Sequence, residues 1–120
     1  MKDLSNEIKT AKKAALQAGY LLLNSREKFN IRLNKDSKDI KLQADIESEM
    51  IIKSIISTDS PFPILAEETG KSKQNLGDTF WVIDPLDGTA NYNRGIPFCC
   101  VSIGLIRDMD PILGVIYDFN

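Results

Sequence analysis

The chain has 120 residues, of which 42% are hydrophobic and 27% are charged, and its formal net charge is −2. This composition is typical of one globular domain, and the negative charge disfavours nucleic acids and anionic membranes as partners held by bulk charge. The apolar runs are too short to span a bilayer. The charged N-terminal segment lacks the apolar core of a signal peptide, so we expect a cytoplasmic protein.

The sequence contains no histidine. Histidine is the commonest general base and a usual zinc ligand, so catalysis would depend on carboxylates, hydroxyls, backbone groups or a hard metal ion. The two cysteines, Cys99 and Cys100, are adjacent and therefore poorly placed to bond each other. They lie in an apolar run and are predicted to be buried small hydrophobic residues.

The first half of the chain predicts two helices. Apolar residues recur every three or four positions over residues 4–25, which indicates an amphipathic helix. A polar stretch over 34–39 indicates a loop. A second helix with a broad isoleucine-rich face is predicted over 44–57, and Pro61 and Pro63 end it.

The second half predicts strands joined by turns. Apolar, β-rich runs occupy residues 62–66, 80–83, 98–106 and 112–117. The last two runs flank a short polar segment and should form a hairpin, while residues 69–78 suit a surface connection. Two helices followed by strands predict an α+β fold, in which the helices pack on one face of a mainly antiparallel sheet.

The densest group of polar residues follows the strand at 80–83. Asp84 and Asp87 flank Pro85, which cannot donate to a strand ladder, so pairing should stop there and the two carboxylates should converge. Gly88 lets the backbone approach a ligand closely, and Thr89 begins a short helix whose amides attract an anion such as phosphate. Carboxylates repel phosphate unless a cation lies between them, so the segment predicts a hard divalent metal, with Mg²⁺ the best fit.

Glu67 and Glu68 supply further oxygens if their strand lies beside the strand that leads to Asp84. Each of these features alone has an ordinary structural explanation. Asp before Pro and Asp-Gly are common in turns, and a Glu pair after a strand is often a solvated corner. Their occurrence together, followed by Thr89 and Asn91, favours a site.

Residues 84–92, Asp-Pro-Leu-Asp-Gly-Thr-Ala-Asn-Tyr, resemble the first signature of the inositol monophosphatase superfamily. Leu-Ala-Glu-Glu-Thr at 65–69 is similar to the acidic segment of that family. Ile-Pro-Phe-Cys-Cys-Val-Ser-Ile-Gly at 96–104 is similar to its proline-aromatic run into a strand. Asp45 resembles the aspartate of the family's Thr-x-x-Asp element, although other residues replace the threonines here. The resemblance covers essentially the whole chain.

The resemblance implies a layered α/β sugar-phosphatase-type fold, of which residues 1–120 are the N-terminal metal-binding portion. It implies hydrolysis of a phosphomonoester by a two-metal-ion mechanism, with Thr89 and Glu67 helping to deprotonate a water and the amides of Gly88 and Thr89 holding the phosphate. Asp45 would orient Thr89 from behind, or would be a plain helix N-cap. The implied Mg²⁺ ligands are Glu67, Asp84, the backbone carbonyl of Leu86, and Asp87.

The resemblance also implies a small phosphorylated substrate, inhibition by Li⁺ and a homodimer in the complete protein. Inositol monophosphate is the first expected substrate. A 3′(2′),5′-bisphosphate nucleotidase and a fructose-1,6-bisphosphatase remain alternatives, as does a non-catalytic fragment. A later Trp-Asp motif of the family supplies another metal carboxylate, but Trp81 is the only tryptophan here. Three carboxylates do not balance two Mg²⁺ ions, so the 120-residue chain alone is predicted to be inactive.

Overall fold

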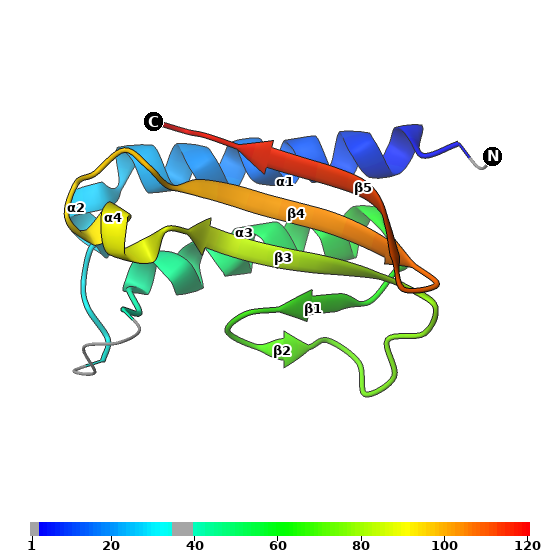
Figure 1. Cartoon of the computed structure of the whole chain (residues 1–120). Coiled ribbons are helices and arrows are strands. Elements are labelled where there is room, and N and C mark those ends of the chain that lie inside the picture. Colours follow the sequence, from blue (N-terminus) through cyan, green and yellow to red (C-terminus); the bar gives the residue numbers. More distant parts are fainter. Residues whose placement is uncertain (1–2, 35–39) are drawn as a thin grey trace.

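The computed structural model describes residues 3–34 and 40–120. Most of the loop predicted over 34–39 lies outside the described residues. The helices of the described part are α1 (Ser5–Asn24), α2 (Arg26–Phe29), α3 (Gln43–Asp59) and α4 (Thr89–Asn93) (Figure 1). The strands are β1 (Ile64–Ala66), β2 (Gly70–Lys71), β3 (Thr79–Asp87), β4 (Cys100–Arg107) and β5 (Asp110–Tyr117).

The two long helices form one layer against one face of the sheet (Figure 1). Helix α1 packs on α3 and on β4 and β5, and α3 packs on β3. Both helices were predicted from their apolar periodicity, and the predictions are confirmed. The contact surface of α1 consists largely of small residues, which let the neighbouring backbones approach closely: Ala11, Ala14, Ala15, Ala18 and Gly19. The single turn α2 was not predicted.

The sheet has the strand order β2-β1-β3-β4-β5. Strand β1 runs parallel to β3, whereas every other neighbouring pair is antiparallel, so the predicted mainly antiparallel sheet is confirmed. The predicted hairpin is β4–β5. The short strand β2 lies in the segment that was predicted to be only a surface connection. The parallel pairing sets Ala66 opposite Ile83, so the residues that follow β1 lie beside Asp84.

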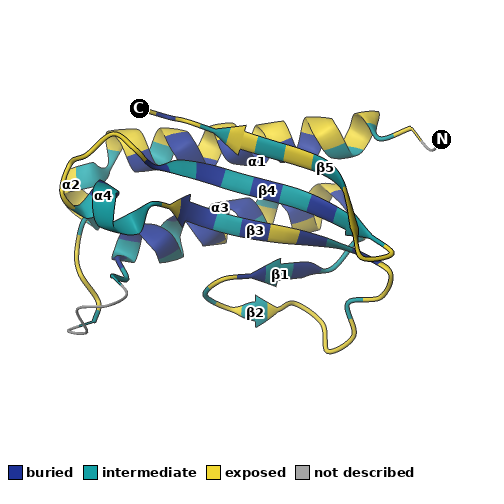
Figure 2. Ribbon diagram, viewed as in Figure 1, coloured by how far each residue is buried: buried dark blue, intermediate teal, exposed yellow. Residues whose placement is uncertain are grey.

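The core lies between the helices and the sheet (Figure 2). Side chains alternate along a strand, so Trp81 and Ile83 of β3 face the helices and are buried. The indole nitrogen of Trp81 donates a hydrogen bond to Ser60 Oγ at 3.0 Å. On the opposite face Val82 is 37% exposed, and Ile116 of β5 is 74% exposed. The described residues therefore bury one face of the sheet and leave apolar side chains on the other. They also include no helix that is both long and apolar enough to cross a membrane.

Two sequence predictions around the acidic motif were wrong. Strand β3 does not end at Asp84, because the ladder resumes at Asp87 after a bulge that contains Pro85. Cys99 is buried as predicted, but Cys100 is only half-buried. Cys100 is the first residue of β4, and alternation along the strand turns its side chain away from the helix layer, whereas Val101 is fully buried.

Candidate metal and phosphate site

The parallel pairing of β1 and β3 brings the carboxyl groups of Glu67 and Asp84 into contact. When Glu67 is protonated, it donates a hydrogen bond to Asp84. Glu67 as a whole residue is exposed. Partial burial of its carboxyl group, this hydrogen bond and the neighbouring negative charge of Asp84 together raise the pKa of Glu67 to about 7. Two carboxylates that repel each other at neutral pH are stabilised as ions when a cation lies between them. This pair therefore fits a hard cation.

A bulge shapes the backbone that carries Asp84. Asp84 pairs with Ser102 and Asp87 pairs with Cys100, so β3 has one more residue than β4 between these two points. The extra length falls at Pro85, which has no amide hydrogen for the ladder. Its carbonyl is nevertheless satisfied, because the buried Ser48 of α3 donates its hydroxyl hydrogen to it at 2.7 Å. The bulge is thus held by the helix layer.

Asp87 does not join the Glu67–Asp84 pair. Its side chain is exposed, and its Oδ2 lies 3.9 Å from the Cys100 sulfur on the neighbouring strand. Burial, and then the charges of Asp87 and Asp84, raise the pKa of the Cys100 thiol. Within residues 3–34 and 40–120, no group of three or more acidic or thiol side chains lies close enough together to hold a metal ion in this conformation. The structure thus brings together two of the predicted carboxylate ligands and holds the third apart.

Gly88 has a conformation that other residues rarely adopt. Its φ is +90°, and a β-carbon there would lie 2.6 Å from the carbonyl oxygen of Phe98. The left-handed turn at Gly88 ends β3 and starts α4 at Thr89. The predicted helix start at Thr89 is confirmed. The sequence predicted that Gly88 lets the backbone approach a ligand, whereas the need for glycine that the structure shows comes from the left-handed turn and from crowding by the Phe98 carbonyl.

Asp45 connects the first turn of α3 to the first turn of α4. The Thr89 hydroxyl lies 2.9 Å from Asp45 Oδ1, and the Leu42 amide donates to Oδ2 at 2.8 Å. The alternative of a plain helix N-cap is wrong, because Leu42 is the N-cap of α3 and Asp45 is its third residue. Asp45 accepts a hydrogen bond from the N-cap amide and also contacts Thr89. Asp45 is only 2% exposed. Burial raises the pKa of Asp45 to about 6. The two hydrogen bonds favour the charged carboxylate and act in the opposite direction, but burial has the larger effect.

The Thr89 hydroxyl has a second acceptor within reach, the Leu86 carbonyl at 3.0 Å. A hydroxyl has only one hydrogen to donate. Hydrogen bonds to a charged acceptor are the stronger ones, so the ionised Asp45 takes it. When Asp45 is protonated it can donate to Thr89, and Thr89 can then donate to Leu86. The protonation of Asp45 thus determines whether the Leu86 carbonyl, a predicted metal ligand, accepts this hydrogen bond.

A cavity of about 590 Å³ opens beside these residues. Four of the predicted site residues line it and come from three separate parts of the chain: Asp45, Glu67, Gly88 and Thr89. The other three predicted site residues, Asp84, Leu86 and Asp87, do not line it. Lys41 Nζ lies 2.6 Å from Glu68 Oε2, so Glu68 is paired with a cation at the cavity wall. The lining residues are Asn34, Ile40, Lys41, Asp45, Glu67, Glu68, Gly88, Thr89 and Ala90.

Several residues that support the site were not found from the sequence. The hydroxyl of the buried Tyr92 donates to the Leu22 carbonyl at 2.7 Å, and the Arg26 guanidinium lies 4.3 Å from the centre of the Tyr92 ring. These contacts fasten α4 to α1 and α2. Ser48 and Glu49 were also missed, although their spacing from Asp45 puts them on the same helix face as the apolar core residues. Their position as polar residues on an apolar helix face was the signal in the sequence that could have identified them.

The comparisons agree with this geometry. The family model described as "Inositol monophosphatase family" matches residues 3–119 of this chain. The "Inositol-1-monophosphatase" of Synechocystis is 38% identical over 97% of this chain and 41% of its own length. The "Fructose-1,6-bisphosphatase/inositol-1-monophosphatase" of Aquifex aeolicus is 38% identical over 98% of this chain and 45% of its own length.

Among solved structures, the extragenic suppressor protein SuhB of Bartonella henselae superimposes with a TM-score of 0.87 at 33% identity. That match covers 96% of this chain and 46% of the SuhB chain. The chain thus spans less than half the length of these relatives. The match of the family description over residues 3–119, together with the Asp-Pro-Leu-Asp-Gly-Thr turn and its neighbouring carboxylates, shows that this chain belongs to the inositol monophosphatase family.

Proposed function

We propose that this protein hydrolyses small phosphomonoesters in a Mg²⁺-dependent reaction, and that residues 1–120 form its N-terminal metal-binding portion. The observation that carries the proposal is the contact between the Glu67 and Asp84 carboxyl groups, which raises the pKa of Glu67 to about 7 in the absence of a cation. The phosphatase names of the relatives from Synechocystis and Aquifex aeolicus support it.

The ligands proposed for Mg²⁺ are the carboxylates of Glu67, Asp84 and Asp87 and the carbonyl of Leu86. All are oxygens, which Mg²⁺ prefers. Bound Mg²⁺ would neutralise the phosphate ester and make a water more acidic. Glu67 and Asp84 are already in contact, whereas Asp87 lies against Cys100 and would have to turn from it to share a metal. The further carboxylate that a second Mg²⁺ requires would come from outside residues 1–120.

The attacking water is proposed to lose its proton to the Glu67 carboxylate, with help from Thr89, which orients the water. Above the pKa of Asp45, which is about 6, the Thr89 hydroxyl directs its hydrogen toward Asp45. Its lone pairs are then free to accept a hydrogen bond from water, and this orients the water. Asp45 acts through Thr89 and is therefore a positioning residue.

The phosphate group is proposed to bind at the turn between β3 and α4. Gly88 and Thr89 line the cavity of about 590 Å³, and amides in the first turn of a helix have no partner within the helix, which supports this proposal. Inositol monophosphate is the substrate we favour, because it gives the Synechocystis relative its name. Fructose 1,6-bisphosphate is the second candidate, since the Aquifex aeolicus relative carries both names.

Phosphate release by the complete protein tests the proposal. The substrates are inositol 1-phosphate, fructose 1,6-bisphosphate and adenosine 3′,5′-bisphosphate, each with Mg²⁺, with Zn²⁺ and with EDTA. We expect hydrolysis of at least one substrate with Mg²⁺, loss of activity with EDTA, recovery with Mg²⁺ but not with Zn²⁺, and inhibition by Li⁺. Activity that survives EDTA, or that only Zn²⁺ restores, would contradict the proposal.

A further inference from the structure

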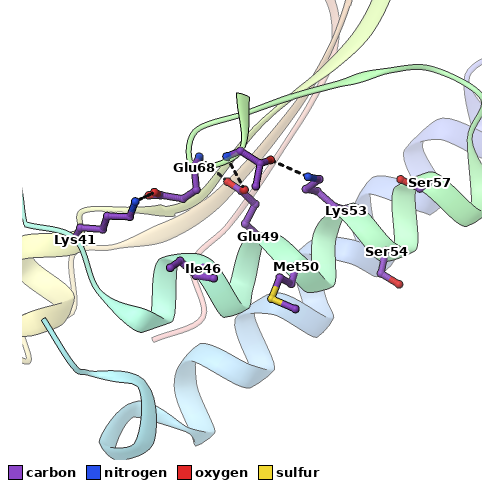
Figure 3. Close-up of a pocket in the computed structure, with 9 residues that line it drawn as sticks. Lys41, Ile46, Glu49, Met50, Lys53, Ser54, Ser57 and Glu68 are labelled. Atoms are coloured by element: carbon purple, nitrogen blue, oxygen red, sulfur yellow. Dashed lines mark hydrogen bonds and ion pairs between the residues drawn. The ribbon is translucent and has the colours of Figure 1, made fainter. Parts of the chain in front are cut away.

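Glu49 is a carboxylate buried in the middle of α3, and within residues 3–34 and 40–120 it forms no salt bridge, although the positive charge of Lys41 lies near enough to interact with it. Glu49 is only 1% exposed. Burial of a carboxylate is costly unless hydrogen bonds satisfy it. The amide of Glu68 donates to Glu49 Oε1 at 2.8 Å, and the amide of Thr69 donates to Oε2 at 3.1 Å. Both carboxylate oxygens of Glu49 thus accept hydrogen bonds from backbone amides of one turn (Figure 3). This turn follows β1 and begins at Glu67.

Two lysines hold the side chains of the same turn. Lys53, one helical turn after Glu49, donates to Thr69 Oγ1 at 2.7 Å. Lys41 pairs with Glu68 at 2.6 Å. Figure 3 shows these contacts at the wall of a pocket along α3, with Glu49 beneath the backbone and a lysine on either side. The turn is therefore fixed at its two amides and at two side chains, while the Glu67 carboxyl group is directed to Asp84.

The residue before Glu49 holds the other half of the site. Ser48 donates to the Pro85 carbonyl at 2.7 Å, inside the bulge between Asp84 and Leu86. Ser48 and Glu49, two successive residues of α3, thus form hydrogen bonds with the two backbone segments that carry the Glu67 and Asp84 carboxylates. Each carboxylate would otherwise be free to move away, because like charges repel when neither is protonated.

We propose that Glu49 is a positioning residue for the metal site, which sets the Mg²⁺ affinity by fixing the backbone of residues 68–69 and so the place of the Glu67 carboxylate. This inference rests on the proposed function, since it requires that Glu67 binds Mg²⁺. Glu49 does not itself touch the metal. Partners that orient metal ligands typically change metal affinity by about 10- to 100-fold when they are mutated.

The test is Glu49→Gln in the intact protein. Glutamine has the same shape but one acceptor oxygen, and its NH₂ group would face a backbone amide that also donates. The matched control is Glu47→Gln, the same change on the same helix at a half-buried residue that accepts a hydrogen bond from Gln43. A second control, Ile52→Val, removes a methylene from the core face of α3.

Calorimetric titration with MgCl₂ gives the affinity, and NMR of the metal-free protein follows the Glu68 and Thr69 amides. We expect Glu49→Gln to weaken Mg²⁺ binding by about tenfold or more and to speed hydrogen exchange at these two amides. Both controls should bind Mg²⁺ as the wild type does. Unchanged affinity in Glu49→Gln, or an equal loss in Ile52→Val, would overturn the positioning role alone. A wild-type protein without Mg²⁺ affinity would overturn the proposed function as well.

Discussion

The Thr89 hydroxyl lies 2.9 Å from Asp45 Oδ1 and so joins the start of α4 to the start of α3 across 44 residues of sequence. This contact links the turn that carries the acidic motif to the helix that supports it. The same Asp45 carboxylate accepts the Leu42 amide, so one buried group serves both the helix end and the candidate site.

Replacement of Thr89 by valine should destabilise the protein. Valine keeps the shape but removes the donor, so the buried Asp45 loses one of its hydrogen bonds. A hydrogen bond to a charged group contributes about 1.5–3 kcal/mol, and we expect a loss of that size in the free energy of unfolding at pH 8. Urea denaturation of the complete protein, followed by far-ultraviolet circular dichroism, measures it. Thr89→Ser, which keeps the hydroxyl, should stay within about 0.5 kcal/mol of the wild type; an equal loss in both variants would show that the methyl group matters instead.

The metal-free protein should lose stability as the pH rises toward neutral. The pKa of Glu67 is raised from 4.5 to about 7 in the folded protein, mainly by burial and by Asp84. A raised pKa means that the folded state binds the proton more tightly, so this stability is present below about pH 4.5 and is lost as the pH passes 7. Asp45 adds an effect of the same sign between 3.8 and about 6.

Urea denaturation in EDTA at several pH values between 4.5 and 8 checks this pH dependence. Glu67→Gln cannot ionise and should flatten the upper part of the profile, near pH 6–7. Mg²⁺ should stabilise the wild type more at pH 8 than at pH 5, because protons compete with the metal for Glu67. A wild-type profile that Glu67→Gln leaves unchanged would mean that other groups titrate in this range.

Asp87→Asn should abolish turnover in the complete protein while the fold stays intact. An amide of the same shape cannot balance the charge of a metal ion. We expect far more than a tenfold loss in kcat/KM, with tenfold corresponding to about 1.4 kcal/mol of barrier. The control is Asp110→Asn, a change at an exposed residue in the β4–β5 turn region. Turnover within tenfold of the wild type at saturating Mg²⁺ would remove Asp87 from the metal site.

The 120-residue polypeptide by itself should self-associate. Within the described residues, β5 pairs with β4 alone and forms an edge of the sheet, and Ile116 on this strand is 74% exposed. Unpaired edges with exposed apolar side chains favour strand pairing between molecules. Sedimentation of the polypeptide should show dimers or larger species, and Ile116→Lys should shift it toward monomer. A wild-type monomer at high concentration would contradict this expectation.

The sequence by itself determined much of the fold and proposed the residues of the candidate site. The apolar periodicity of residues 4–25 and 44–57 is a local pattern, and it predicted α1 and α3 to within a few residues. The acidic motif pointed to Asp84, Asp87, Gly88 and Thr89, because proline restricts the backbone and glycine permits unusual conformations, and both effects can be read from the local sequence.

The tertiary structure decided how these residues meet. The contact between Glu67 and Asp84 depends on the parallel pairing of β1 with β3, which no local pattern encodes. The Pro85 carbonyl in the bulge accepts a hydrogen bond from the Ser48 hydroxyl, 37 residues away in the sequence. The role of Glu49 could not be read from the sequence either, because its place on the apolar face of α3 indicates burial but not which amides it binds. Hydrogen bonds between distant segments form only when packing brings those segments together, and here helix α3 does so.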